Sequence, residues 1–168
     1  PTRIARILLH ALTVALIAAS IFVLCQVPIE RIALSFFPAD TELLELAAVY
    51  FYIRIWAAPA TIGLYALNGW FLGLQNARIP LIISIVSNLG NVLFSVFFVR
   101  NFGWGVAGVA WATVIAQYIG FGLAFLLFVI RYGKEWRWPE KDYLLDLGSI
   151  KEFFGVNGDI FIRTLCLI

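Results

Sequence analysis

Four long runs of mainly apolar residues alternate with short polar links along the chain. A helix needs about 20 mainly apolar residues to cross a bilayer. The second run exceeds this length, and Pro59 predicts a kink in it, because proline removes a backbone hydrogen bond and its ring clashes with the preceding turn. The runs predict four complete membrane-spanning helices, at residues 7–26, 42–74, 79–99 and 106–130.

Composition supports the same fold class. The chain is 62% hydrophobic and 13% charged, whereas a soluble domain is about 45–50% apolar and about 25% charged. These values exclude a water-soluble globule, a disordered chain and a disulfide-rich secreted module. A net charge of +2 is too small to indicate a nucleic-acid partner. We therefore expect an all-α, polytopic membrane protein whose main partner is the lipid bilayer.

The polar tail divides the chain into three regions. Residues 1–131 hold the four spans, 132–150 form a polar connector, and 151–168 begin a fifth, truncated helix after a capping-box spacing. The chain starts with Pro1 and has no methionine, so we expect a piece of a longer protein. Most lysines and arginines outside the spans lie on the same side of the membrane as the connector, and Arg31 and Arg100 lie on the other side. Because cytoplasmic loops carry an excess of these residues, the connector is predicted to be cytoplasmic.

Each predicted span carries a stripe of polar side chains. In the second span they fall within about 60° of one another around the helix. Two interpretations stay open: a shared wet cavity, or hydrogen bonds that hold packed helices together. Small residues at every fourth position, from Gly108 to Gly120, predict close helix packing. The stripes comprise His10, Thr13 and Ser20; Tyr50, Arg54, Thr61, Tyr65 and Asn68; Ser84, Ser87, Asn88, Asn91 and Ser95; and Thr113 and Gln117.

Catalytic chemistry is not indicated by these residues. The chain has one histidine, and no Asp or Glu occurs between Leu46 and Ile130. Cys25 and Cys166 lie far apart in apolar runs and suggest neither a metal site nor a disulfide framework. An intramembrane catalyst needs at least a pair of titratable groups. We therefore expect no enzyme and no cofactor.

Several motifs resemble those of one transporter family. They are Tyr50–Arg54 followed by Pro59, the run Asn68–Pro80, Asn88–Asn91, Gly105–Thr113, and the terminal stretch from Asn157. Together, in this order, they resemble the multidrug and toxic compound extrusion (MATE) family, and within it the bacterial DinF-like branch. The resemblance covers nearly the whole chain.

The resemblance implies a twelve-helix exporter made of two six-helix lobes. The chain then supplies helices three to six of the first lobe, the inter-lobe connector and the start of helix seven. Such a protein is a multi-pass component of the bacterial inner membrane. It exports organic cations or amphipathic, drug-like compounds in exchange for Na⁺ or H⁺ and needs the remainder of the parent transporter. Family members of this kind rock two repeats around a central site.

The resemblance also implies a substrate and ion pathway through Tyr50, Asn68, Asn91, Ser95 and Thr113. Asn68, Asn91 and Thr113 are the candidate Na⁺ ligands. Ser95 stands where the family often has an aspartate, and a serine cannot carry a charge, so coupling through that helix is an open question. Two alternatives remain: a lipid-linked saccharide flippase of the same superfamily, and a non-transporting structural subunit. A flippase predicts a cationic cavity, to which only Arg54 could contribute.

Overall fold

Helices account for the regular structure that the computed structural model shows in residues 2–36 and 40–133, the part of the chain it describes. The long helices are α1 (Thr2–Leu24), α5 (Arg78–Phe102) and α6 (Gly105–Tyr132). These three helices, together with the stretch Thr41–Gly73, are long and apolar enough to cross a membrane. The four predicted spans are thereby confirmed, whereas the predicted connector and fifth helix lie outside the described residues.

The predicted end of the first span needs correction. The first span ends at Leu24, and a separate helix α2 (Gln26–Ser35) follows a turn at Cys25, where the sequence predicted helix as far as residue 26. Pro28 lies in the first turn of α2, where a missing N–H costs nothing, because the first turn of a helix has no intrahelical acceptors for its donors.

The second predicted span is a broken helix. Helix α3 (Thr41–Arg54) leads into a 3₁₀ turn η1 (Ile55–Ala57), and helix α4 (Ala58–Gly73) follows it. Pro59 occupies the first turn of α4. The predicted kink is therefore a change from α-helix to 3₁₀ helix just before the proline. Pro59 then lies in the first turn of α4, where its ring clashes least with the preceding backbone.

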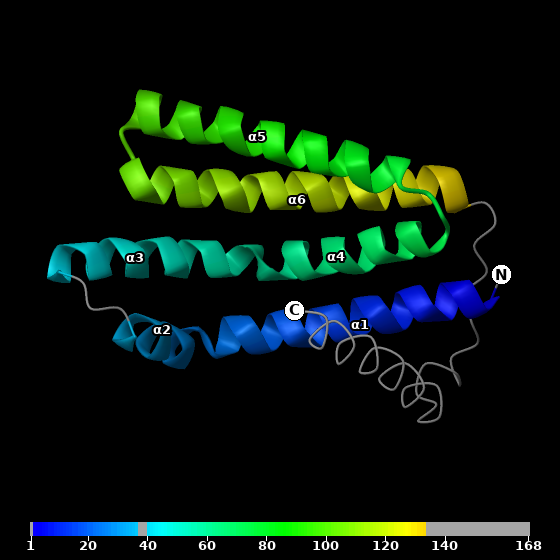
Figure 1. Ribbon diagram of the computed structural model, residues 1–168, viewed down its shortest axis with the longest axis horizontal. Coiled ribbons are helices and arrows are strands. Elements are labelled where there is room, and N and C mark those ends of the chain that lie inside the picture. The colour runs from blue at the N-terminus through cyan, green and yellow to red at the C-terminus, as the bar shows by residue number, and fades with distance from the viewer. Residues whose placement is uncertain (1, 37–39, 134–168) are drawn as a thin grey trace, which may run out of the picture.

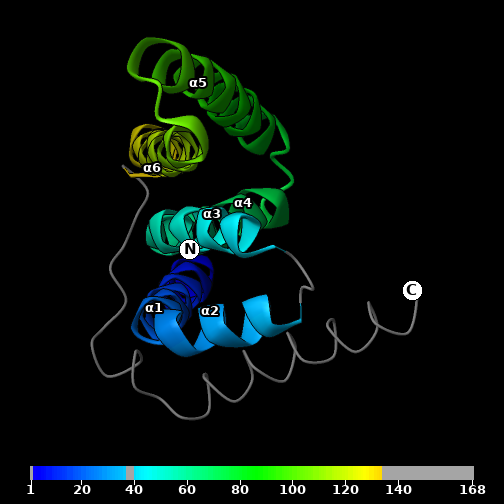
Figure 2. The ribbon, with the colours of Figure 1, turned by 90° about the vertical axis from the view of Figure 1, so that its left-hand side faces the viewer.

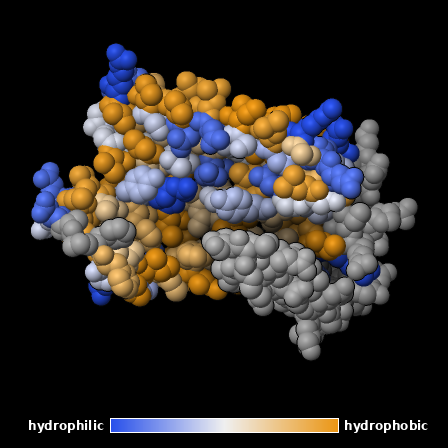
Figure 3. All heavy atoms as spheres, in the orientation of Figure 1, coloured by the Kyte–Doolittle hydropathy of each residue, from blue (hydrophilic) through white to orange (hydrophobic). Residues whose placement is uncertain are grey.

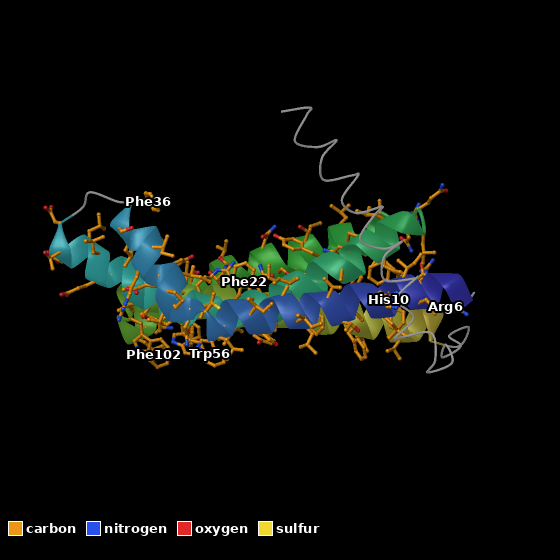
Figure 4. The ribbon with its side chains drawn as sticks, turned by 90° about the horizontal axis from the view of Figure 1, so that it is seen from below. Arg6, His10, Phe22, Phe36, Trp56 and Phe102 are labelled. Atoms are coloured by element: carbon orange, nitrogen blue, oxygen red, sulfur yellow. The ribbon has the colours of Figure 1, made fainter. Side chains whose placement is uncertain are left out.

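The helices are stacked in layers, with α6 inside the stack (Figures 1 and 2). Helix α5 packs on one side of α6, and both α3 and α4 pack on the other. Helix α1 lies against α4, farthest from α5, and Arg6 and His10 lie along its first turns (Figure 4). Helix α6 thus packs between α5 on one side and the α3–α4 layer on the other.

Small residues on α6 allow this packing. Gly108, Ala112, Ala116 and Gly120 are all buried, which confirms the ridge predicted from their spacing. A side chain added at Gly120 would overlap the Ser87 hydroxyl of α5 and also meet Leu64 of α4. The three helices therefore approach one another most closely around Gly120.

An apolar core lies at the end of the bundle that holds the α4–α5 turn. Phe71 is fully buried there, and Leu8, Ile83 and Phe128 join it from α1, α5 and α6. The ring of Tyr132 packs edge-on against Trp70, with centroids 5.1 Å apart. Its hydroxyl accepts a 3.1 Å hydrogen bond from the Asn76 amide in the α4–α5 turn. This hydrogen bond connects the α4–α5 turn to the end of α6.

Removal of the Tyr132 hydroxyl tests the contribution of the Asn76–Tyr132 hydrogen bond to stability. Tyr132→Phe is expected to lower the free energy of unfolding by about 1 kcal/mol, the usual net contribution of one hydrogen bond. Thermal unfolding of the full-length protein in detergent measures the change. Tyr65→Phe is the control, because the Tyr65 side chain is 70% exposed. Equal losses in the two variants would contradict the assignment.

Candidate polar pathway

The structure joins two of the predicted site residues across the α5–α6 contact. The Asn91 amide nitrogen on α5 donates a 2.9 Å hydrogen bond to the Thr113 hydroxyl oxygen on α6. The Thr113 hydroxyl in turn donates to the Val109 carbonyl of its own helix, also at 2.9 Å. These two bonds fix the orientation of the Asn91 and Thr113 side chains in the middle of the bundle.

The bonds leave acceptor capacity on both side chains. A hydroxyl oxygen has two lone pairs, and the Asn91 amide uses one of those on Thr113. The Asn91 side-chain carbonyl takes no part in that bond, since its amide nitrogen is the donor. The pair therefore presents neutral oxygens that are already held in place, which is the arrangement an oxygen-liking cation needs.

Further oxygens in the interior have no partner among the described residues. The side-chain carbonyl oxygen of Asn68 on α4 and the hydroxyl of Ser95 on α5 are both buried and unbonded. A buried polar atom without a hydrogen bond costs about 1–3 kcal/mol, so such atoms indicate a place for a donor or a cation. The Thr61 and Ser87 hydroxyls are in the same state.

These unbonded hydroxyls differ from other hydroxyls of the bundle. Thr13 and Ser20 on α1 are exposed, and each donates at 2.8 Å to a carbonyl one turn earlier in its own helix. Bonds of this kind are the usual way for a membrane helix to satisfy a hydroxyl. The Thr13 and Ser20 hydroxyls are thus satisfied within α1, whereas the Thr61, Ser87 and Ser95 hydroxyls make no hydrogen bond among the described residues.

Tyr50 stands apart from the other candidates. It lies on α3, before the helix break, with its side chain 36% exposed. A 3₁₀ turn advances each residue by about 120°, against about 100° in an α-helix, so η1 rotates everything after it by about 60°. By ideal geometry the stripe from Tyr50 to Tyr65 then spreads over about 120°, rather than the about 60° expected for an unbroken α-helix.

Several polar side chains of the predicted stripes lie on the surface of the described bundle. Tyr65 on α4 and Ser84 and Asn88 on α5 are exposed rather than bonded across helix contacts of the described bundle. The view in Figure 3 shows a band of hydrophilic residues across the bundle, with hydrophobic residues above it and, on the left, below it. Polar groups in a bilayer must face protein or water, so such a band is compatible both with a wet cavity and with packing against further helices.

Two polar contacts were not foreseen from the sequence. The Tyr118 hydroxyl on α6 donates a 3.0 Å hydrogen bond to the Trp56 carbonyl, and the Asn76–Tyr132 bond closes the α4–α5 turn. The signal for Tyr118 was a hydroxyl in the middle of an apolar span, which needs a partner. Nothing in the spacing pointed to a carbonyl on another helix.

The oxygens of the site are not accompanied by a metal-binding cluster. No group of three His, Cys, Asp or Glu side chains gathers within residues 2–36 and 40–133. The carboxylates of the described helices, Glu30, Glu42 and Glu45, lie on α2 and α3 rather than on α5 or α6.

Four spanning helices, with paired and unpaired neutral oxygens between them, define a multi-pass membrane protein with a polar interior. Comparison with known families identifies it further. The model of the MatE family matches residues 1–97. The chain therefore belongs to the MatE family, as the sequence motifs indicated.

Individual relatives agree with this assignment. The chain is 33% identical over 99% of its length to DNA damage-inducible protein F of Escherichia coli, of which it covers 36%. It is 34% identical over 70% of its length to human multidrug and toxin extrusion protein 1, covering 21% of that protein. No solved structure matches the chain. The chain thus spans about a third or less of the length of these relatives.

Proposed function

We propose that the chain is part of a secondary active efflux transporter that exports organic cations or amphipathic compounds in exchange for Na⁺ or H⁺. The observation that carries the proposal is the Asn91–Thr113 pair, fixed by hydrogen bonds, in a bundle that also holds buried, unbonded oxygens on α4 and α5. Relatives named for multidrug and toxin extrusion support the activity. Such oxygens suit a site that binds a cation and then releases it.

The role that we propose for each residue follows from the chemistry of its side chain. Asn68, Asn91 and Thr113 supply neutral oxygens to the coupling ion, and Tyr50 and Ser95 line the pathway. None of the three ligands carries a charge, so the countercharge comes from another part of the parent protein. We place that protein in a bacterial inner membrane, as the Escherichia coli relative suggests, with the end of α6 that leads to the connector on the cytoplasmic side.

Counterflow in proteoliposomes tests the function. Vesicles holding the full-length protein and a fluorescent organic cation receive first a Na⁺ gradient and then a pH gradient. We expect one gradient to drive flux, and Asn68→Ala to reduce it by roughly tenfold, since a lost interaction of about 1.4 kcal/mol changes an equilibrium tenfold.

The matched control is Asn101→Ala, the same chemical change at an exposed position near the end of α5. It is expected to transport at the wild-type rate. Absence of flux under both gradients, with the protein folded, would contradict the efflux proposal and favour the flippase or the structural subunit. Equal losses in the two alanine variants would contradict the role of Asn68.

A further inference from the structure

Because of the break between α3 and α4, the backbone carbonyl of Trp56 takes no part in the hydrogen-bond pattern of either helix. Helix α4 begins at Ala58 with Ala57 as its N-cap, so its first intrahelical acceptor is the Ala57 carbonyl. In the 3₁₀ turn, the Ala58 N–H bonds to the Ile55 carbonyl. The next 3₁₀ bond, to the Trp56 carbonyl, would have to come from Pro59, which has no N–H.

Tyr118 of α6 supplies the missing donor. Its hydroxyl donates to the Trp56 carbonyl at 3.0 Å. Both residues lie near the middle of their spans, Thr41–Gly73 and Gly105–Tyr132. Where a membrane helix is broken, the released carbonyl needs another partner, and a donor on a neighbouring helix is one way to supply it.

Both side chains lie at the edge of the bundle. Tyr118 is 46% exposed and Trp56 is 52% exposed, and Trp56 points outward from the helices (Figure 4). The Tyr118 hydroxyl is the atom that bonds to the Trp56 carbonyl, so removal of that one atom removes the hydrogen bond.

The break also determines how two pathway residues face each other. Tyr50 lies before it and Asn68 lies after it. With η1 in place, the second half of the span is rotated by about 60° relative to a continuous α-helix. A span that regained regular α geometry would bring Asn68 back to the face of Tyr50, because 18 residues at about 100° each make five whole turns.

We propose that Tyr118 is a positioning residue: by bonding to the Trp56 carbonyl it holds the α3–α4 break and so sets the orientation of Asn68 relative to Tyr50. Helix α6 also carries Thr113, so one helix orients candidate ligands on both α4 and α5. The inference rests on the proposed transport function for its functional consequence, although the geometric part stands independently of it.

The first test measures geometry in the full-length protein. With the native cysteines, Cys25 and Cys166 among them, replaced by serine, spin labels at exposed Leu72 and Phe125 report the distance between α4 and α6. Tyr118→Phe is expected to shift and broaden this distance distribution, because α4 loses its hydrogen-bonded anchor. A label pair at Leu46 and Phe125, before the break, is expected to change less.

Tyr52→Phe is the matched control. It removes the same atom from α3, where the Tyr52 hydroxyl donates to Glu30 at 3.4 Å, away from the break. We expect its Leu72–Phe125 distances to equal those of the wild type. An unchanged distribution in Tyr118→Phe overturns the proposal, whether or not the protein transports anything.

The second test measures transport. Tyr118→Phe is expected to raise the substrate KM by about threefold to tenfold, the range that a lost hydrogen bond between membrane helices produces, with a smaller effect on the maximal rate. One outcome separates the two proposals: Tyr118→Phe shifts the distances but leaves the KM at the wild-type value, and Asn68→Ala abolishes flux. In that case positioning by Tyr118 is disproved and the transport function stands. If no variant and no wild-type protein transports, the efflux function fails, and the distances alone decide the geometric part.

Pro59→Ala provides a second variant that keeps the inference falsifiable. Alanine restores an N–H and removes the ring that disfavours α geometry at Ile55. In this background the Trp56 carbonyl gains a donor from its own helix, so adding Tyr118→Phe is expected to change the distances and the KM little. Equal effects of Tyr118→Phe with and without Pro59 would overturn the proposed link to the break.

Discussion

Thr113→Val is expected to reduce ion-coupled transport at least tenfold, whereas Thr113→Ser keeps most of it. Valine has nearly the shape of threonine but lacks the hydroxyl, so the Asn91 amide loses its acceptor at 2.9 Å and the pathway loses an oxygen. An unsatisfied buried partner costs about 1–3 kcal/mol, and each 1.4 kcal/mol is a factor of ten. Serine restores the hydroxyl.

The measurement is initial flux in proteoliposomes as a function of Na⁺ concentration and of pH. The two side chains act as one unit, so Asn91→Ala combined with Thr113→Val is expected to cost little more than either change alone. Additive losses would contradict the paired arrangement. Transport by Thr113→Val at the wild-type rate would remove Thr113 from the pathway.

Gly120→Leu is expected to prevent correct packing of the bundle. A leucine here meets the Ser87 side chain directly and Leu64 at 3.5 Å, so α4, α5 and α6 cannot keep their present separation. Overpacking of this kind costs about 1–3 kcal/mol and sometimes more. We expect a large fall in the yield of monodisperse protein and a lower unfolding temperature in detergent.

Gly122→Leu is the matched control for Gly120→Leu. It lies two residues farther along α6, and a side chain added there meets nothing within 4 Å. Leucine also favours a helix more than glycine does, by about 1 kcal/mol, so this variant is expected to be as stable as the wild type or more stable. Similar behaviour of the two variants would disprove the close approach at Gly120.

Most of the helical architecture could be predicted from the sequence, because its signals are local. Long apolar runs define spans in a bilayer, and small residues at every fourth position define a close contact. The ridge from Gly108 to Gly120 is buried as expected. The break before Pro59 was predicted as a kink, but its form as a 3₁₀ turn depends on how a neighbouring helix satisfies the released carbonyl.

The candidate pathway was predictable in part. The spacing identified Asn91 and Thr113 as polar members of adjacent spans, and the structure joins them by a hydrogen bond. Their roles in ion and substrate transport remain predictions, as do those of Tyr50, Asn68 and Ser95. Periodicity on one helix cannot show which residue of another helix it faces, because that depends on helix rotation and crossing. The Tyr118–Trp56 bond is of this kind, since one partner is a backbone atom that no side-chain pattern reveals.

The place of α6 in the stack has a consequence for biosynthesis. Helices α3, α4 and α5 all pack against α6, yet α6 is the last of the described helices to leave the ribosome. Until it is made, Asn91 has no Thr113 to bond, and the carbonyl at the α3–α4 break has no Tyr118. Insertion of the earlier helices into the membrane therefore precedes their assembly, and the arrival of α6 is the step that completes this part of the bundle.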